Sequence, residues 1–291
     1  MEKNDGIIHA TGDYSARSVG QRNILDMAEW LAKWGYTTPE ILCSLIDVKS
    51  SSQKRIVKRL VDGHWAKLVP CPTAVDGYCE RTRKVDKDGK LRTVVSEPML
   101  LVPTGKARTL FSTTYGVQAA RALGTGSAER IFHDLSVQRI ALRVLDQSMP
   151  EWADQAEVWP GALYRAVHPS SAPPGFSNWE PPKKFFDAVA IFRGDQKKFL
   201  LGIEVELSRK DEEYGLHDAF EKIATDVRNR HIAQVMYFFP SENLSRLYAT
   251  KMRDWPGLFA GFDGDDPVYK NDLVSRVSFH ATPQIFRMRF H

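Results

Sequence analysis

The sequence predicts a mixed α/β chain (α+β overall) with two domains: a helical domain with a β-hairpin, then a domain in the order αβββαβ. Helical spacing of apolar residues over 24–61 and two apolar, strand-like runs at 185–192 and 199–207 are the main observations behind this prediction. A chain of 291 residues is long enough for two domains. The expected divisions are a flexible tail at 1–22, a first domain at 23–111, a linker at 112–127 and a second domain at 128–291.

Composition excludes several classes of protein. No apolar stretch approaches the roughly 20 residues of a membrane span, and the N-terminus lacks the layout of a signal peptide. The three cysteines lack Cys-x-x-Cys spacing, which argues against a disulfide framework or a zinc knuckle. We therefore expect a cytoplasmic protein that does not associate with membranes.

Three helices are predicted in the N-terminal domain. The segment 24–34 has apolar residues at helical spacing and ends at Gly35, and 38–46 begins with Thr38 as N-cap and Pro39 in the first helical position. A third helix begins near 50–52 and continues through 53–61. Its apolar residues lie four apart, which leaves its basic residues on the outer face.

A basic hairpin completes this domain. The segment 63–69 reads as a turn into a strand, 81–95 as a hairpin around Asp88 and Gly89, and 104–111 as a short closing helix. Three helices followed by a basic hairpin is the order of a winged helix-turn-helix, which reads bases with its third helix and contacts phosphates with the wing. The expected base contacts are Ser51, Ser52, Gln53, Lys54 and Arg55. The basic residues expected to serve the DNA backbone or the outer helix face are Lys58, Arg59, Arg81, Arg83, Lys84, Lys87, Lys90 and Arg92.

Charge is distributed unevenly along the chain. The net charge is +4, but between Lys49 and Arg108 there are 14 Lys and Arg against 6 Asp and Glu. Such a concentration is the electrostatic footprint of a nucleic-acid binder. Composition alone leaves a nucleic-acid binder and a merely solvated basic surface equally open. Together with the predicted winged helix, the charge favours double-stranded DNA as the partner, and the alternative is a winged helix that contacts proteins.

Three carboxylates in the C-terminal domain lie in or beside apolar runs. Glu204 and Glu206 share one face of the predicted strand 199–207, because side chains alternate along a strand. Asp187 lies 17 positions before Glu204, which allows it to face Glu204 from an adjacent antiparallel strand. Burial of unpaired carboxylates costs several kcal/mol, so these groups should be paired, protonated or bound to a cation.

A divalent cation is the productive option. Oxygen ligands suit Mg²⁺ or Mn²⁺, and a cation held by Asp187, Glu204 and Glu206 would activate water at a phosphodiester. The alternative is a cluster of ion pairs with nearby basic residues, namely Lys183, Lys184, Arg209 or Lys210.

The order of elements in the C-terminal domain resembles the core of the PD-(D/E)XK nuclease superfamily. It comprises a helix at 128–145, a strand-like segment at 152–167, a Pro-rich loop at 168–182, strands at 185–192 and 199–207, a helix at 215–228 and a strand at 232–239. Asp187 and Glu204 match the motif acids. Glu206 stands where the motif lysine is expected, so the resemblance leaves the lysine's role to Glu206 or to Lys210.

The whole chain resembles the replication-relaxation family, which includes MobC-type plasmid relaxases. The resemblance rests on the winged helix, the string His133-Asp-Leu-Ser-Val137, and Glu204-Val-Glu-Leu-Ser-Arg-Lys210 with Tyr214 beyond it. It implies metal-dependent nicking of one DNA strand near a plasmid transfer or replication origin. The partners it suggests are an accessory mobilization or replication protein and a second copy of the chain.

Two matched residues have open roles. His133 is a candidate catalytic residue, although a single histidine on a helix more often has a packing or hydrogen-bonding role. Tyr214 is a candidate nucleophile, but nuclease-fold chemistry normally uses water, so we expect no protein–DNA adduct. The alternative function is a non-enzymatic DNA-binding regulator of plasmid replication or transfer, whose nuclease-like domain serves dimerisation or partner docking.

Overall fold

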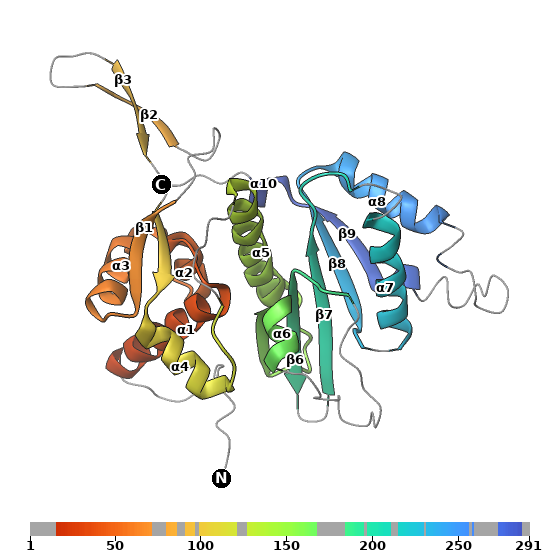
Figure 1. The fold of residues 1–291 in the computed structure, drawn as a ribbon, viewed down its shortest axis with the longest axis horizontal. Helices are drawn as coiled ribbons and strands as arrows, with labels where there is room; N and C mark the ends of the chain where they lie inside the picture. The colour runs from red at the N-terminus through yellow and green to blue at the C-terminus, as the bar shows by residue number, and fades with distance from the viewer. Residues whose placement is uncertain are drawn as a thin grey trace, which may run out of the picture. The chain divides into compact units, whose positions relative to one another are not determined.

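A computed structural model describes most of the chain, in two compact units. The described residues are 16–71, 80–85, 91–96, 99–120, 127–167, 184–194, 197–210, 215–229, 231–255, 258 and 273–286. The N-terminal unit includes the described residues up to Gln138, and the C-terminal unit spans Arg139–Phe286. Helices and sheets are both present, which confirms the mixed α/β class (Figure 1).

The N-terminal unit contains the helices and the two small sheets near the beginning of the chain. Its elements are α1 (Ala16–Trp34), α2 (Pro39–Leu45), the 3-10 turn η1 (Ser50–Ser52), α3 (Gln53–Asp62), β1 (Ala66–Pro70), β2 (Glu80–Val85), β3 (Leu91–Ser96), β4 (Met99–Pro103) and α4 (Gly105–Tyr115). The helix α1 begins at Ala16, eight residues before the predicted start at Ile24, and α4 continues to Tyr115.

Local signals account for the breaks between the first helices. Gly35 follows α1 with a φ of 79°, a left-handed conformation that glycine adopts without steric cost. Thr38 caps α2 by accepting a hydrogen bond from the backbone N–H of Ile41 at 3.3 Å, and Pro39 occupies the first turn. The predicted capping of this helix is confirmed.

Two antiparallel pairs of strands follow the helices. β1 pairs with β4, whose Leu101 also forms a bridge with Thr37, and β2 pairs with β3 in a separate hairpin (Figure 1). The core of the unit is formed by buried side chains from these helices and from β4, including Leu31, Leu42, Leu60, Leu101 and Phe111.

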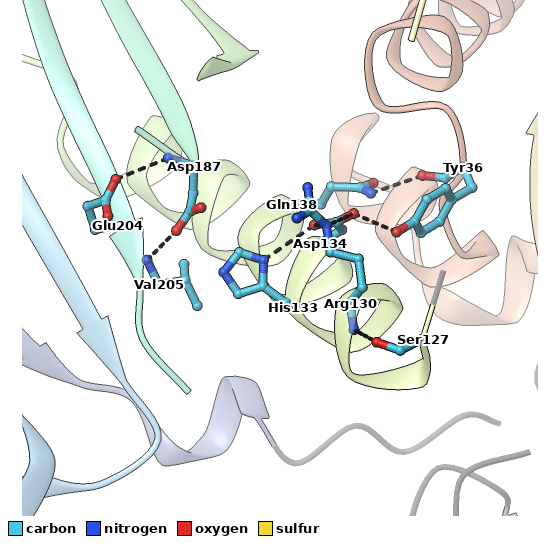
Figure 2. Close-up of polar contacts among 9 residues, drawn as sticks. All are labelled: Tyr36, Ser127, Arg130, His133, Asp134, Gln138, Asp187, Glu204 and Val205. Carbon is cyan, nitrogen blue, oxygen red and sulfur yellow. Dashed lines mark hydrogen bonds and ion pairs between the residues drawn. The ribbon is translucent and has the colours of Figure 1, made fainter. Parts of the chain in front are cut away.

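The first half of α5 (Ala128–Gln147) belongs to this unit. Its buried Gln138 accepts a hydrogen bond from Trp30 Nε1 at 2.9 Å. It also donates one to the carbonyl of Tyr36 at 2.9 Å (Figure 2). Asp134, one turn earlier, accepts a hydrogen bond from the Tyr36 hydroxyl at 2.7 Å. The two units therefore divide inside α5, between Gln138 and Arg139, and not at the predicted linker 112–127.

The C-terminal unit is built on one five-stranded sheet. Besides the end of α5, its elements are β5 (Gln155–Pro160), α6 (Gly161–Val167), β6 (Ala188–Gly194), β7 (Lys197–Val205), α7 (His217–Arg228), β8 (Gln234–Phe239), α8 (Glu242–Asp254), β9 (Val277–Ala281) and α10 (Pro283–Phe286). The predicted strand-like segment 152–167 consists of a strand followed by a short helix. The helix α8 is an addition to the elements predicted from the sequence.

The sheet has the order β5-β6-β7-β8-β9. Figure 1 labels the strands β6 to β9. The strands β5, β6 and β7 are antiparallel neighbours, whereas β8 runs parallel to β7 and β9 parallel to β8. The helix α7 provides the crossover that a parallel connection between β7 and β8 needs. Both faces of β7 are buried at its end, because Ile203, Glu204 and Val205 are at most 2% exposed.

Aromatic rings fasten two helices to this sheet. Phe220 of α7 contacts Tyr237 of β8 and Tyr248 of α8 edge-on, with ring centroids 6.2 and 6.3 Å apart.

None of the helices in the described part combines the length and apolar character that a membrane crossing requires.

Candidate functional site

Asp187 and Glu204 lie opposite each other at one end of the β6–β7 pair. The last paired residues there are Ala188 and Ile203, so the next position in register places Asp187 across from Glu204, as predicted. The backbone N–H of Asp187 donates to Glu204 Oε1 at 3.2 Å, and that of Val205 donates to Asp187 Oδ2 at 2.8 Å (Figure 2). Each acid is thus held by the backbone of the other strand.

Two lysines provide counter-charges for the glutamates. Lys184 Nζ lies 2.9 Å from Glu204 Oε2, and Lys210 Nζ forms an ion pair with Glu206 Oε1. The ion-pair alternative raised by the sequence therefore describes part of this cluster. The glutamate side chains are at most 8% exposed, and those of Lys184 and Lys210 are 14% and 37% exposed.

Burial dominates the protonation of the two glutamates. Burial and the neighbouring charge of Asp187 raise the pKa of Glu204 to about 8, although Lys184 opposes the shift. Burial also raises the pKa of Glu206, and Lys210 opposes it. Burial lowers the pKa of Lys210, but the charge of Glu206 outweighs this effect and raises it overall.

Two tyrosines border the same cluster. Tyr237 of β8 pairs in register with Glu204, is fully buried, and its hydroxyl hydrogen-bonds no other group in the described residues. Burial and the nearby charge of Glu204 raise its pKa. Tyr248 accepts a hydrogen bond from the backbone N–H of Lys210 at 3.2 Å, which holds the backbone five residues after the end of β7.

Asp226 holds the other side of the cluster. Its buried carboxylate accepts a hydrogen bond from the backbone N–H of Lys184 at 2.8 Å and lies 3.2 Å from His231 Nδ1. Asp226, Tyr237 and Tyr248 were not predicted as parts of the site. No local pattern marks them, because each lies in an ordinary amphipathic or apolar element and meets the cluster only through the fold.

The described residues offer a divalent cation two converging carboxylates, those of Asp187 and Glu204. Asp187 and Glu204 converge, their mutual repulsion contributes to the raised pKa of Glu204, and the Tyr237 hydroxyl beside them is without a hydrogen bond in the described structure. Mg²⁺ is commonly held by one or two carboxylates together with water and substrate phosphate. The described residues contain no cluster of three His, Cys, Asp or Glu arranged to hold a metal. Lys210 engages the carboxylate of Glu206, as Lys184 engages that of Glu204.

The predicted base-reading helix is α3, whose apolar and basic faces separate as expected. Ile56 and Leu60 are buried, whereas Lys54, Arg55, Lys58 and Arg59 are exposed. Lys58 forms an ion pair with Asp62 at 2.8 Å, and Arg59 donates to the carbonyl of Gly20 at 3.2 Å. Ser51, Ser52 and Gln53 lie at the N-terminal end of α3 or in the turn before it.

The predicted wing corresponds to the β2–β3 hairpin. Its backbone register pairs Arg81 with Val95, Arg83 with Thr93, and Lys84 with Arg92. Lys87, Lys90, Lys183 and Tyr214 lie outside the described residues.

His133 belongs to the N-terminal unit, where it lies on α5. Its Nδ1 is 3.3 Å from Asp134 Oδ1, and its side chain is 24% exposed (Figure 2). Burial opposes the ionisation of Asp134, but hydrogen bonds from His133 and Tyr36 and the charge of Arg130 lower its pKa overall. These contacts join the His133–Asp134 pair to Tyr36 and Arg130 within its own unit.

Comparison with known proteins adds no relative to this description. No family model, curated protein or solved structure matches the chain.

Proposed function

We propose that the chain is a DNA-binding protein whose C-terminal unit nicks one DNA strand in an Mg²⁺- or Mn²⁺-dependent reaction. The N-terminal unit would serve as a winged helix and the C-terminal unit as a PD-(D/E)XK-like nuclease domain. A plasmid transfer or replication origin is the proposed site of action, in line with the resemblance to the replication-relaxation family. The observation that carries the proposal is the interlocked pair of the partly accessible Asp187 and the buried Glu204.

The strand arrangement supports a nuclease-like domain. Three antiparallel strands, a crossover helix and a parallel fourth strand place Asp187 and Glu204 at the end of β7, next to the parallel partner β8. Carboxylates with strongly perturbed pKa values are concentrated at functional sites, because burial of charge is otherwise selected against.

The chain's own residues divide the proposed work. Asp187 and Glu204 would hold the cation, which when bound polarises the scissile phosphate and a water molecule. Lys210, fixed by Tyr248 and paired with Glu206, would take the place of the motif lysine and orient that water. Lys184 would exchange its contact with Glu204 for a phosphate oxygen.

The exposed basic face of α3 supports the DNA-binding part of the proposal. Lys54, Arg55 and Lys58 project from a helix whose opposite face is packed in the core, and η1 precedes it with three serines. Lysine and arginine on one helix face contact phosphates, and polar residues at the helix start reach base edges in the major groove.

The test is a topoisomer assay on a supercoiled plasmid that carries the chain's own origin region. Wild-type protein, Asp187→Asn and the exposed-acid control Asp154→Asn would each be incubated with Mg²⁺, with Mn²⁺ and with chelator. We expect open circles from the wild type and the control only when metal is present, and none from Asp187→Asn. DNA binding by Asp187→Asn should be unchanged.

Other outcomes contradict particular parts of the proposal. Cleavage retained by Asp187→Asn would exclude the carboxylate pair as the site, and linear product would indicate a double-strand endonuclease. A protein–DNA adduct that survives denaturation would show that the nucleophile is a protein side chain and not water. Tyr214 would be the first residue to substitute.

A regulator without enzymatic activity is the second candidate. The observation that favours it is that Lys184 and Lys210 already neutralise Glu204 and Glu206 without a metal. It predicts origin binding that is indifferent to Mg²⁺ and to Asp187→Asn, and unchanged supercoils in the assay. Calorimetric Mg²⁺ binding that Asp187→Asn removes would count against it.

A further inference from the structure

The described segment before β6 carries an unusually exposed aromatic ring next to the carboxylate pair. Phe185 is 64% exposed, the largest value among the large apolar side chains of the described residues. Burial alternates along 185–187, since Phe186 is buried at 4% exposure and Asp187 is partly accessible. Phe185 therefore faces outward two residues before a proposed cation ligand.

The exposure of Phe185 does not follow from a loose backbone. The backbone N–H of Lys184 donates to Asp226, and Asp187 exchanges hydrogen bonds with the end of β7. Phe186 is held more tightly still. A Cβ at Gly161 would lie 1.8 Å from the Phe186 carbonyl oxygen, and one at Gly202 would lie 2.6 Å from its ring. The segment is thus pinned on both sides of the exposed ring.

A cationic side chain already stacks near this ring. The guanidinium carbon of Arg165, on α6, lies 4.1 Å from the centroid of the Phe185 ring. The amine of Lys184 donates to the carbonyl of Phe185 at 2.9 Å and also pairs with Glu204. An exposed aromatic ring with a guanidinium over it is therefore joined to the carboxylate pair by Lys184, which contacts both the Phe185 carbonyl and Glu204.

We propose that Phe185 and Arg165 form a stacking subsite for an unpaired nucleobase beside the Asp187–Glu204 pair. The inference rests on the proposed function, since it names the form of DNA that this site takes. Aromatic rings and arginine planes stack on nucleobases, and such stacking is largely independent of base identity. Bases in an intact duplex are stacked on each other, so only a base that has left the helix offers its face.

The subsite makes the site selective for melted or single-stranded DNA. Arg165 and Lys184 supply positive charge for the phosphates on either side of the stacked base. The two DNA strands must therefore separate before the DNA binds at the carboxylate pair.

The test is a double-mutant cycle between the protein and the DNA, carried out in chelator so that cation-dependent cleavage plays no part. Fluorescent single-stranded oligonucleotides from the origin, each with one abasic position, would be titrated with wild-type protein and Phe185→Leu. Leucine keeps an apolar side chain but removes the aromatic face. Met149→Ala is the matched control, because Met149 is also exposed, at 41%, in the same unit.

We expect Phe185→Leu to weaken single-strand binding roughly tenfold, the size of one base–aromatic stack. Wild-type protein should lose as much affinity for an oligonucleotide with one particular abasic position as Phe185→Leu loses for the intact oligonucleotide. Phe185→Leu titrated with that abasic oligonucleotide should show no greater loss than either change alone. The affinity of Phe185→Leu for duplex DNA should equal that of the wild type. Met149→Ala and Phe185→Trp should both bind single strands with wild-type affinity.

Two results would overturn the subsite. If Phe185→Leu bound single strands with unchanged affinity, the Phe185 ring would not be part of the DNA interface. Its exposure would then point to a protein partner. Additive losses of affinity at every abasic position would show that no base stacks on it. Failure of plasmid nicking together with Phe185-dependent coupling would instead refute the proposed activity and retain the subsite.

Discussion

Burial and charge oppose each other strongly at the Glu204 carboxyl. It is 2% exposed, faces Asp187, and is compensated by Lys184 at 2.9 Å. Because its pKa is about 8 in the folded protein and near 4.5 when unperturbed, the folded state holds a proton across this interval that the unfolded state releases. The metal-free protein therefore loses stability at this residue as the pH rises from about 4.5 to 8.

Glu204→Gln tests this linkage. Glutamine keeps the shape but does not titrate, so the unfolding free energy of the variant relative to wild type should rise between pH 5 and pH 8. Urea unfolding in chelator at several pH values measures the difference. Glu221→Gln, on the exposed side of α7, should leave the pH dependence unchanged. A constant difference across the range would contradict the raised pKa.

The start of α6 is the element on which the geometry of the carboxylate pair depends. The backbone N–H of Gly161 donates to the carbonyl of Asp187 at 3.2 Å, and a side chain at Gly161 would collide with the backbone of Phe186. Gly161→Ala should destabilise the protein by about 1–3 kcal/mol or more, as overpacking does. Gly105→Ala is the control and should be near neutral, because a Cβ added there, at the start of α4, would meet no atom within 4 Å. Denaturant unfolding measures the stability of both variants. If Gly161→Ala were as stable as Gly105→Ala, the close approach of Gly161 to Phe186 would be refuted.

The helix α3 makes a separate prediction about DNA binding. Removing one phosphate-binding cation from a protein–duplex complex lowers the slope of log affinity against log salt concentration by about 0.9. Substituting Lys54 and Lys58 by glutamine should therefore weaken binding and reduce this slope by up to about 2. Lys222→Gln is the matched control, because Lys222 pairs with Asp218 on α7 as Lys58 pairs with Asp62 on α3. An unchanged slope would favour a protein-binding role for α3.

Binding of a cation should be visible in the stability of the whole molecule. A ligand that binds only the folded state stabilises it by about 2.7 kcal/mol at a hundredfold excess over its Kd. Mg²⁺ should raise the unfolding temperature of the wild type and of Asp154→Asn, but not that of Asp187→Asn. Calorimetric melting with and without Mg²⁺ provides the measurement, and equal shifts in all three proteins would place the cation elsewhere.

Local signals in the sequence determined the mixed α/β class, the breaks around Gly35 and Thr38, the basic face of α3 and the pairing of Asp187 with Glu204. These features depend on helical spacing, turn chemistry and strand alternation, which act over a few residues. A residue count sufficed for Asp187 and Glu204, because β6 and β7 are consecutive antiparallel strands.

The partners of the carboxylates were decided only by the tertiary structure. Asp226, Tyr237 and Tyr248 reach the cluster from α7, β8 and α8, and the division within α5 depends on Gln138 meeting Trp30 and Tyr36 about 100 positions earlier. Lys184 and Lys210 were candidate ion-pair partners in the sequence, and the structure decided that Lys184 pairs with Glu204 and Lys210 with Glu206. Contacts between distant segments leave no periodic pattern in the sequence, because each partner is chosen by packing and burial in the folded chain.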